Sequence, residues 1–109
     1  MQRECFAMDL KNDPALIAEY EAWHTKVWPE VLAHGRRSGI ASMEIYRIEN
    51  RLFMITEVDD DFDPASRSNP GAGNPKVEEW EELMWTFQQA LPWAKPCEKW
   101  LPMTKIFEL

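Results

Sequence analysis

The chain has 109 residues, a formal net charge of −7 and a pI near 4.8. This length suits one domain, and we expect residues 1–109 to form it. The acidic balance disfavours a nucleic-acid or membrane partner, because phosphates and anionic lipids repel it. No apolar run approaches the ~20 residues that span a bilayer, and residues 1–6 do not resemble a signal peptide. We therefore expect a cytoplasmic protein, with Cys5 and Cys97 as reduced thiols.

The first strand and the first helix are predicted over residues 3–37. Residues 3–10 alternate between two faces, which indicates a strand. Asp13-Pro14 is typical of a helix start, with Asp13 as the N-cap. Pro29 should kink this helix or begin a second one, and Gly35 or Gly39 should end it. Apolar side chains follow at helical spacing: Leu16, Ile17, Tyr20, Trp23, Val27, Val31 and Leu32.

The rest of the chain predicts two further strands, a long loop, a second helix and a last strand. Residues 40–48 alternate, residues 52–58 are expected as the next strand, and the two predict an antiparallel hairpin with its turn at residues 50–51. Residues 59–74, acidic and then rich in Ser, Asn, Pro and Gly, predict a long loop. Asn74-Pro75 indicates a second helix start, and that helix should run to about Leu91, before Pro92. A last strand is expected at residues 103–108.

The resulting order, β-α-β-β-α-β, predicts an α+β fold of the ferredoxin-like type, with both helices on one face of the sheet. The other face would carry Cys5, Ala7, Tyr46 and Ile48, which are poor choices for a surface in water. A second copy of the same sheet is the simplest cover. We therefore expect a homodimer of the dimeric α/β barrel type.

Tyr20, His24 and Trp28 are spaced at i, i+4 and i+8, which puts them on one face of a continuous helix. His24 is the candidate for proton transfer, because the pKa of an imidazole lies near neutrality. The alternative is a core histidine satisfied by one hydrogen bond. Tyr20 can orient the imidazole and touch a ligand, or simply belong to the core. Trp28 can line a pocket, or anchor the chain at Pro29.

Other side chains carry weaker signals. Trp80 is a core residue by default, or a flat platform for the C–H surface of a sugar. Glu30 can serve as an acid or base, or stabilise a helix N-terminus. Glu30 and His34 have the spacing of a metal-binding pair, but no third ligand is near in sequence, and we expect no metal site. Glu81 is notable as the neighbour of Trp80.

The block Tyr20-x3-His24-x3-Trp28-Pro29-Glu30 resembles the signature helix of the L-rhamnose mutarotase family. The similarity extends along most of the chain, through the opening strand, the strand at 45–46, Trp80 and the closing Ile106-Phe107. The resemblance implies a small ferredoxin-like dimer that interconverts the anomers of a deoxysugar without cofactor or metal. It also implies that His24 transfers the proton, Tyr20 contacts the substrate and Trp80 packs on the sugar.

Two positions depart from the rhamnose pattern of that family. Met43 stands where the rhamnose enzymes have a sugar-contacting tyrosine, and Glu81 replaces the second tryptophan of a pair. Both changes fall where the sugar's hydroxyl pattern should be read. The resemblance therefore implies a 6-deoxyhexose, with L-fucose as a serious candidate beside L-rhamnose.

Two other functions share the architecture. A dimeric ferredoxin-like oxygenase or haem-handling protein would use His24 on iron or on an organic substrate. A non-catalytic module would use the same aromatic side chains to bind a small molecule. A haem absorption band would favour the first, and binding without anomer exchange would favour the second.

Overall fold

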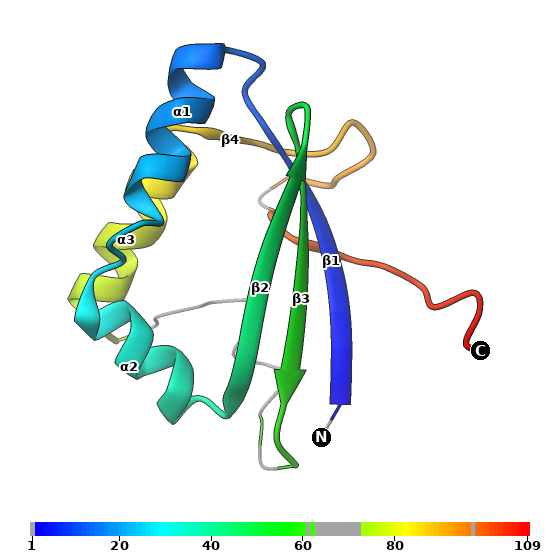
Figure 1. Cartoon of the computed structure of the whole chain (residues 1–109). Helices are drawn as coiled ribbons and strands as arrows, with labels where there is room; N and C mark the ends of the chain where they lie inside the picture. Colours follow the sequence, from blue (N-terminus) through cyan, green and yellow to red (C-terminus); the bar gives the residue numbers. More distant parts are fainter. Residues whose placement is uncertain (1, 61, 63–72, 97) are drawn as a thin grey trace.

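The computed structural model describes residues 2–60, 62, 73–96 and 98–109, and consists of two layers. A curved antiparallel sheet forms one layer, and three helices cover one of its faces (Figure 1). The elements in chain order are β1 Gln2–Leu10, α1 Pro14–Trp23, α2 Pro29–Arg37, β2 Ile40–Ile48, β3 Arg51–Val58, α3 Pro75–Trp85, β4 Gln88–Gln89 and β5 Leu101–Pro102.

The sheet has the order β2-β3-β1-β4, and β5 also pairs with β1. This is the ferredoxin-like arrangement, so the predicted α+β fold class is confirmed. The central pair runs from Gln2 opposite Val58 to Asp9 opposite Arg51. β2 then pairs with β3 along its whole length, with one irregularity between Ile40 and Ser42.

The helix starts follow the predicted chemistry. Asp13 caps α1 by accepting hydrogen bonds from the Ala15 and Leu16 amides at 2.9 and 3.4 Å. Asn74 caps α3 by accepting from the Val77 amide at 3.4 Å. Pro14 and Pro75 occupy the first positions, where no backbone N–H is needed. Pro29 begins a second helix, which was one of its two predicted roles.

Gly39 follows the C-cap of α2 and adopts φ +99°, the left-handed region that favours glycine. A Cβ atom here would lie 2.8 Å from the Asp59 carboxylate. Gly39 was one of two glycines predicted to end the helix, and the geometry selects it.

The core lies between the helices and the inner face of the sheet. Phe6, Met8 and Leu10 of β1 are 0–5% exposed, whereas Cys5 and Ala7 are half-buried on the other face. Period-2 alternation in the sequence predicted this division correctly. Among the predicted stripe of the first helix, Leu32 is an exception, because it is 46% exposed.

Two predicted boundaries are wrong. The turn lies at residues 49–50, one position earlier than expected, with Glu49 at φ 52°. The second helix ends at Trp85 and not near Leu91, because Thr86 donates its hydroxyl hydrogen to the Leu83 carbonyl oxygen and closes the last turn. Phe87 and Leu91 are buried as predicted, but they lie beyond the end of the helix.

The predicted last strand at residues 103–108 does not form. The places beside β1 are taken by Gln88–Gln89 and by Leu101–Pro102. The Met103 amide still donates to the Cys5 carbonyl oxygen at 2.8 Å. Beyond it the chain leaves the sheet, and residues 104–109, here named the C-terminal tail, are all exposed.

Two predictions concern residues outside the described part. Most of the loop expected at residues 59–74 falls there, namely 61 and 63–72, and so does Cys97. Cys5 is a free thiol. None of the described helices is long and apolar enough to cross a bilayer.

Candidate active site

His24 lies at the end of α1, as the C-cap residue. Its Nδ1 is 2.9 Å from the Tyr20 carbonyl oxygen, and its ring centroid is 4.5 Å from that of Tyr20. A carbonyl oxygen only accepts, so Nδ1 must carry the hydrogen of this bond. In the neutral ring, Nε2 therefore presents a lone pair. The His24 side chain is half-buried, so it is not sealed into the core.

The predicted continuous face of Tyr20, His24 and Trp28 is only partly correct. Helix α1 ends at Trp23, and the Thr25 hydroxyl closes that end by donating to the Ala22 carbonyl oxygen at 2.7 Å. Trp28 precedes Pro29 and is the N-cap residue of α2. The i, i+4 spacing brings the rings of Tyr20 and His24 together. Trp28 joins this group through its contact with the Trp80 ring of α3.

Trp80 of α3 is the centre of the aromatic cluster and is 5% exposed. Its ring centroid lies 5.2 Å from Trp28, 5.8 Å from His24 and 6.3 Å from Trp23, each in an edge-on geometry. The structure thus joins His24, Trp28 and Trp80, three of the predicted site residues. Trp23 was assigned only to the apolar stripe, although its position next to His24 was a usable signal.

Tyr20 is the most enclosed of the predicted site residues, at 3% exposure. Burial raises the pKa of its phenol to about 12, so the hydroxyl keeps its proton at neutral pH. The Gln88 side-chain amide donates to the hydroxyl oxygen at 3.4 Å. Gln88 was missed by the sequence analysis, which placed it inside a helix. Its own Oε1 is buried without a hydrogen-bond partner in the described part of the chain.

Glu81 lies beside this group and is paired with Lys99, whose ammonium nitrogen is 2.7 Å from a carboxylate oxygen. The same ammonium group sits 4.7 Å from the ring centroid of Trp85. The Glu81 charge also contributes to raising the Tyr20 pKa. Glu81 therefore belongs to the electrostatic surroundings of Tyr20 rather than to a solvated outer face.

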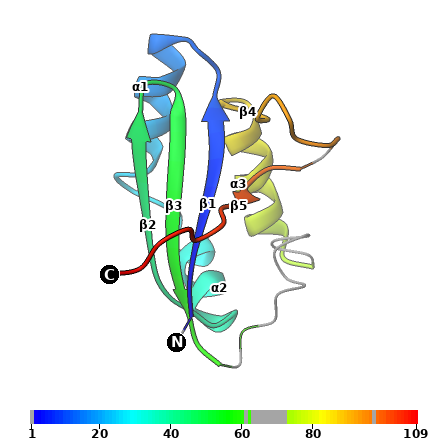
Figure 2. The same cartoon turned by 90° about the vertical axis from the view of Figure 1, so that its right-hand side faces the viewer.

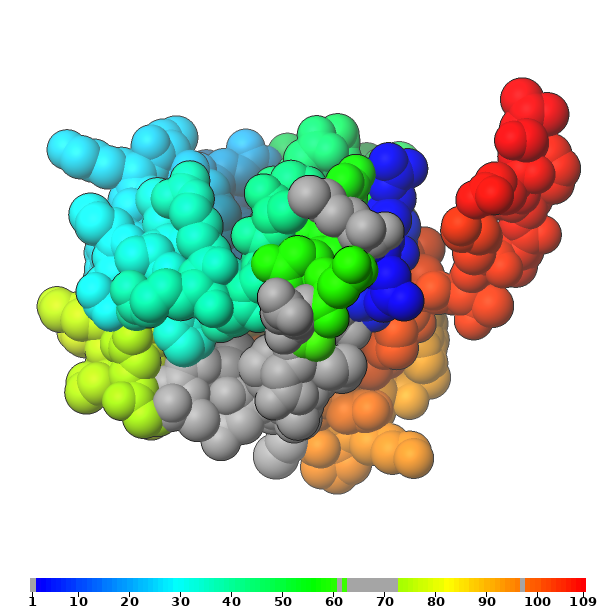
Figure 3. Space-filling model, turned by 90° about the horizontal axis from the view of Figure 1, so that it is seen from below, coloured from blue at the N-terminus to red at the C-terminus, as the bar shows by residue number. Residues whose placement is uncertain are grey.

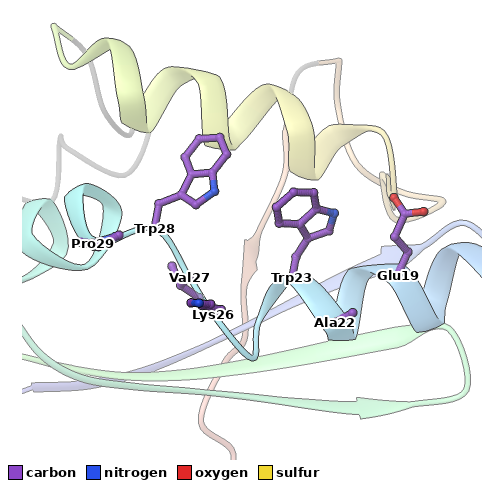
Figure 4. A pocket seen from close by; sticks show the side chains of 7 residues that line it. All are labelled: Glu19, Ala22, Trp23, Lys26, Val27, Trp28 and Pro29. Carbon is purple, nitrogen blue, oxygen red and sulfur yellow. The ribbon is translucent and has the colours of Figure 1, made fainter.

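A hollow of about 600 Å³ adjoins the aromatic cluster where α1 gives way to α2 (Figure 4). Trp23 and Trp28 point from this segment toward α3, and Ala22 and Val27 add apolar surface. Trp28 is the one predicted site residue in its lining. Trp80 contacts both lining indoles, and His24 contacts Trp80 on one side and Tyr20 on the other.

Glu30 is engaged elsewhere. One carboxylate oxygen accepts from the Asn74 amide at 2.9 Å and from Arg37 at 3.1 Å. The Asn74 hydrogen bond is the main reason that the pKa of this exposed carboxyl is lowered. Glu30 therefore links α2 to the start of α3. Within the described residues, no group of three or more His, Cys, Asp or Glu side chains is placed to hold a metal ion.

The family model described as L-rhamnose mutarotase matches residues 3–109. The chain belongs to this family. Its members are mutarotases, isomerases that act at the anomeric centre of a sugar, and this assigns the chain to the enzymes rather than to haem-handling proteins or passive binding modules.

Two relatives that are named for different sugars differ in how similar they are to this chain. An L-fucose mutarotase of Xanthomonas campestris pv. campestris is 50% identical, over 100% of this chain and 89% of the relative. An L-rhamnose mutarotase of Bacteroides thetaiotaomicron is 29% identical, over 100% of this chain and 99% of the relative.

Two solved structures share the fold. The L-rhamnose mutarotase of Formosa agariphila superposes with a TM-score of 0.73 at 21% identity, covering 100% of this chain and 99% of that one. The tetracenomycin F2 cyclase of Streptomyces glaucescens superposes with a TM-score of 0.60 at 15% identity, over the same fractions. The second match shows that this fold also carries unrelated chemistry, so the reaction must be argued from side chains.

Proposed function

We propose that the chain interconverts the α and β anomers of a 6-deoxyhexose, with L-fucose as the first candidate and L-rhamnose as the second. His24 is the proton-transferring residue, and Tyr20, Trp28 and Trp80 form the substrate site. The observation that carries this assignment is the His24–Tyr20 hydrogen bond of 2.9 Å, which leaves Nε2 as the reactive nitrogen. The reaction needs no cofactor.

The reaction opens the ring and closes it again on the other face of the aldehyde. In its protonated form, His24 donates the Nε2 hydrogen to the ring oxygen while the C1–O5 bond breaks. The anomeric hydroxyl loses its proton as C1 becomes an aldehyde. After rotation about C1–C2, the C5 hydroxyl attacks the carbonyl carbon and returns its proton to Nε2. The new anomeric oxygen is then reprotonated.

The second proton acceptor is a water molecule rather than Tyr20 or Glu30. Because the Tyr20 pKa is raised to about 12, its phenol is a hydrogen-bond donor at neutral pH and a poor base. Glu30 already accepts hydrogen bonds from Asn74 and Arg37. Tyr20 instead orients the imidazole through its carbonyl oxygen and ring contact.

The aromatic side chains supply affinity that tolerates both anomers. Indole faces suit the C–H surface and methyl group of a deoxysugar. Such contacts do not depend on the direction of the anomeric hydroxyl, so they bind either anomer. Tight binding of one anomer would raise the barrier to leaving it. Trp28 lines the open hollow, and we propose that the sugar enters there and displaces the closed packing around Trp80.

The preference for L-fucose is supported by sequence. The relative named as an L-fucose mutarotase is 50% identical, whereas the Bacteroides L-rhamnose mutarotase is 29% identical. Met43 and Glu81 also depart from the rhamnose pattern, and Glu81 lies in the electrostatic surroundings of Tyr20. A carboxylate in that place can accept hydrogen bonds from sugar hydroxyls, which a tryptophan cannot do.

The test is anomer exchange measured by saturation-transfer NMR, with L-fucose, L-rhamnose and D-glucose at equal concentration. We expect exchange well above the uncatalysed rate for L-fucose, weaker exchange for L-rhamnose and none for D-glucose. Acceleration of L-rhamnose alone would overturn the sugar assignment. Binding of either deoxysugar without faster exchange would overturn the reaction itself.

We also propose a homodimer in the cytoplasm in which residues 1–109 act as one domain. The match of the family model over residues 3–109 supports the single domain. The dimer is supported by the sheet face that the helices leave open, where Tyr46 and Ile48 are 53% and 64% exposed. Sedimentation velocity across a concentration series tests the dimer, and cell fractionation tests the location.

A further inference from the structure

Gln88 is a buried amide that has no part in the proposed reaction so far. It lies in β4 opposite Leu10 of β1, and paired residues of an antiparallel sheet point their side chains to the same face. Leu10 is 0% exposed and belongs to the core, so Gln88 also points inward, where it is 5% exposed. Figure 2 shows β4 beside the end of β1, where the chain has just left α3. The fold thus places a polar side chain among apolar ones.

The Gln88 amide is only partly satisfied by hydrogen bonds. Its Nε2 donates to the Tyr20 hydroxyl oxygen at 3.4 Å, which is a long bond. Its Oε1 is buried and has no partner in the described part of the chain. Turning the amide over would exchange the two atoms and leave Nε2 without a partner instead. In either orientation one buried amide atom lacks a hydrogen bond, which costs free energy and is rare in native proteins.

The described surroundings do not supply the missing partner. Lys99, the cation of this region, already pairs with Glu81 at 2.7 Å and lies over the Trp85 ring. The C-terminal tail brings no donor, because it stands clear of the rest of the molecule (Figure 3). The ring of Phe87, which lies 6.1 Å from that of Tyr20, has no polar atom to offer. A hydroxyl group of a ligand would be a suitable partner.

Gln88 and His24 contact Tyr20 at two different places. The His24 ring centroid lies 4.5 Å from that of Tyr20, whereas the Gln88 amide contacts the hydroxyl group at the end of the Tyr20 side chain. A pyranose whose ring oxygen meets His24, and whose body lies along the Tyr20 ring, would bring its opposite edge toward the amide. That edge carries the hydroxyl groups at C3 and C4. The configuration at C4 differs between L-fucose and L-rhamnose, so a contact there would bear on the choice of sugar.

We propose that Gln88 is a specificity-determining residue of the substrate site and forms a hydrogen bond with the sugar hydroxyl group at C3 or C4. This inference rests on the proposed function and adds a residue to its site. A hydroxyl group both donates and accepts, so it satisfies the unpartnered amide atom in either orientation. The sugar that displaces the packing around Trp80 then replaces a free-energy cost with a hydrogen bond. A sugar without this hydroxyl group leaves the cost in place and binds less well.

Gln88→Met tests this role, because it removes the amide and keeps a side chain of similar length. Gln89→Met is the matched control, since it makes the same change at the next residue, which is exposed. Saturation-transfer NMR over a range of sugar concentrations gives KM and kcat for the deoxysugar that the wild type exchanges fastest. Gln88→Met should raise KM about tenfold or more, and Gln89→Met should not. The kcat of both variants should stay within about two-fold of wild type, because this hydroxyl group takes no part in bond breaking.

Two further measurements separate contact with the sugar from a structural role. On the analogue that lacks the contacted hydroxyl group, at C3 or at C4, the wild type should lose about tenfold in kcat/KM, whereas Gln88→Met should lose little more. The urea midpoint of Gln88→Met should not fall below that of wild type. The substitution removes a buried atom that lacks a partner and gives up only a long hydrogen bond.

Three results would overturn the inference. An active wild type whose KM is unchanged in Gln88→Met would show that the amide does not contact the sugar. A lower urea midpoint in Gln88→Met, with the loss on the deoxy analogues equal in both proteins, would show that the amide serves the fold alone. A wild type that exchanges no deoxysugar would overturn the proposed function and this inference with it. The first two results leave the reaction intact, so the two kinds of failure are distinguishable.

Discussion

The imidazole of His24 owes its orientation to the backbone that precedes it. Helix α1 stops at Trp23, so the Tyr20 carbonyl oxygen lacks the partner that another helical turn would supply. The His24 ring takes that place through Nδ1 at 2.9 Å. A side chain that caps its own helix in this way is held in one tautomer before any sugar arrives. In the proposed reaction, this would remove part of the entropy cost of aligning Nε2 with the ring oxygen.

His24→Ala should lower kcat/KM for anomer exchange by about 10²–10⁴-fold, the range that one positioned acid or base contributes. The measurement is saturation-transfer NMR on L-fucose at several enzyme concentrations. His34→Ala is the matched control, because His34 is the second histidine of the chain and lies in α2, away from the cluster. A His24→Ala protein that exchanges anomers as fast as wild type would remove this residue from the mechanism.

Tyr20 gives the stability of the protein a signature at high pH. Its pKa rises from 10.0 in the unfolded chain to about 12 in the fold, because burial disfavours the phenolate. Below pH 10 the phenol of Tyr20 is protonated in both the folded and the unfolded state, so the free energy of unfolding keeps its full value. Between about pH 10 and 12 the unfolded state releases a proton that the fold retains, so stability falls by roughly 2–3 kcal/mol.

Urea unfolding at pH 8, 10 and 11.5 measures this loss of unfolding free energy. In Tyr20→Phe the unfolding free energy should fall less steeply with pH. The chain has two tyrosines, and Tyr46 is exposed, so Tyr46→Phe is the control that keeps the buried phenol. If the unfolding free energy falls equally with pH in wild type and Tyr20→Phe, the phenol of Tyr20 reaches water in the folded protein.

At the scale of single elements, the N-cap Asp13 fixes where α1 begins. Asp13→Ala removes the acceptor for the Ala15 and Leu16 amides and should cost about 1 kcal/mol. Asp13→Asn keeps an equivalent cap and should stay within a few tenths of wild type. Both losses are measured from the urea midpoint, provided that the dependence of the unfolding free energy on urea concentration is unchanged. Similar losses for the two variants would point to charge rather than capping.

The elements show which parts of a fold a sequence can predict. Asp13-Pro14, Asn74-Pro75 and Pro29 act through the backbone of their own neighbours, so their helix starts were predicted to the residue. The end of α3 was not, because the pairing of Gln88–Gln89 with Leu10 and Asp9 is a contact between distant segments. A last strand was expected at residues 103–108, but no neighbouring strand pairs with them in the described part of the chain.

The candidate site divides in the same way. Tyr20 and His24 are one helical turn apart, so their contact followed from spacing. The arrival of Trp80 against His24 depends on how α3 packs across α1, which no local pattern encodes. Gln88 was missed for that reason too, since its contact with Tyr20 spans 68 positions in the chain.

At the scale of the whole molecule, the two faces of the sheet serve different purposes. The inner face and the helices bury the core and hold the aromatic cluster around Trp80. The outer face keeps Tyr46, Ile48 and Trp93 more than half exposed. In a 109-residue chain with 45% hydrophobic residues, that is a large share of apolar surface to leave in water. The proposed dimer would bury this surface without altering the site on the opposite face.

A homodimer that unfolds to separated chains makes stability depend on concentration. Each tenfold increase in total protein favours the folded dimer by about 1.4 kcal/mol, because two unfolded chains form from one folded particle. For a folded unit of this size, that should raise the unfolding midpoint by roughly 3–6 °C. Calorimetry at protein concentrations from about 2 to about 200 μM measures this rise in the unfolding midpoint. A wild-type unfolding midpoint that stays constant over this range would exclude the dimer.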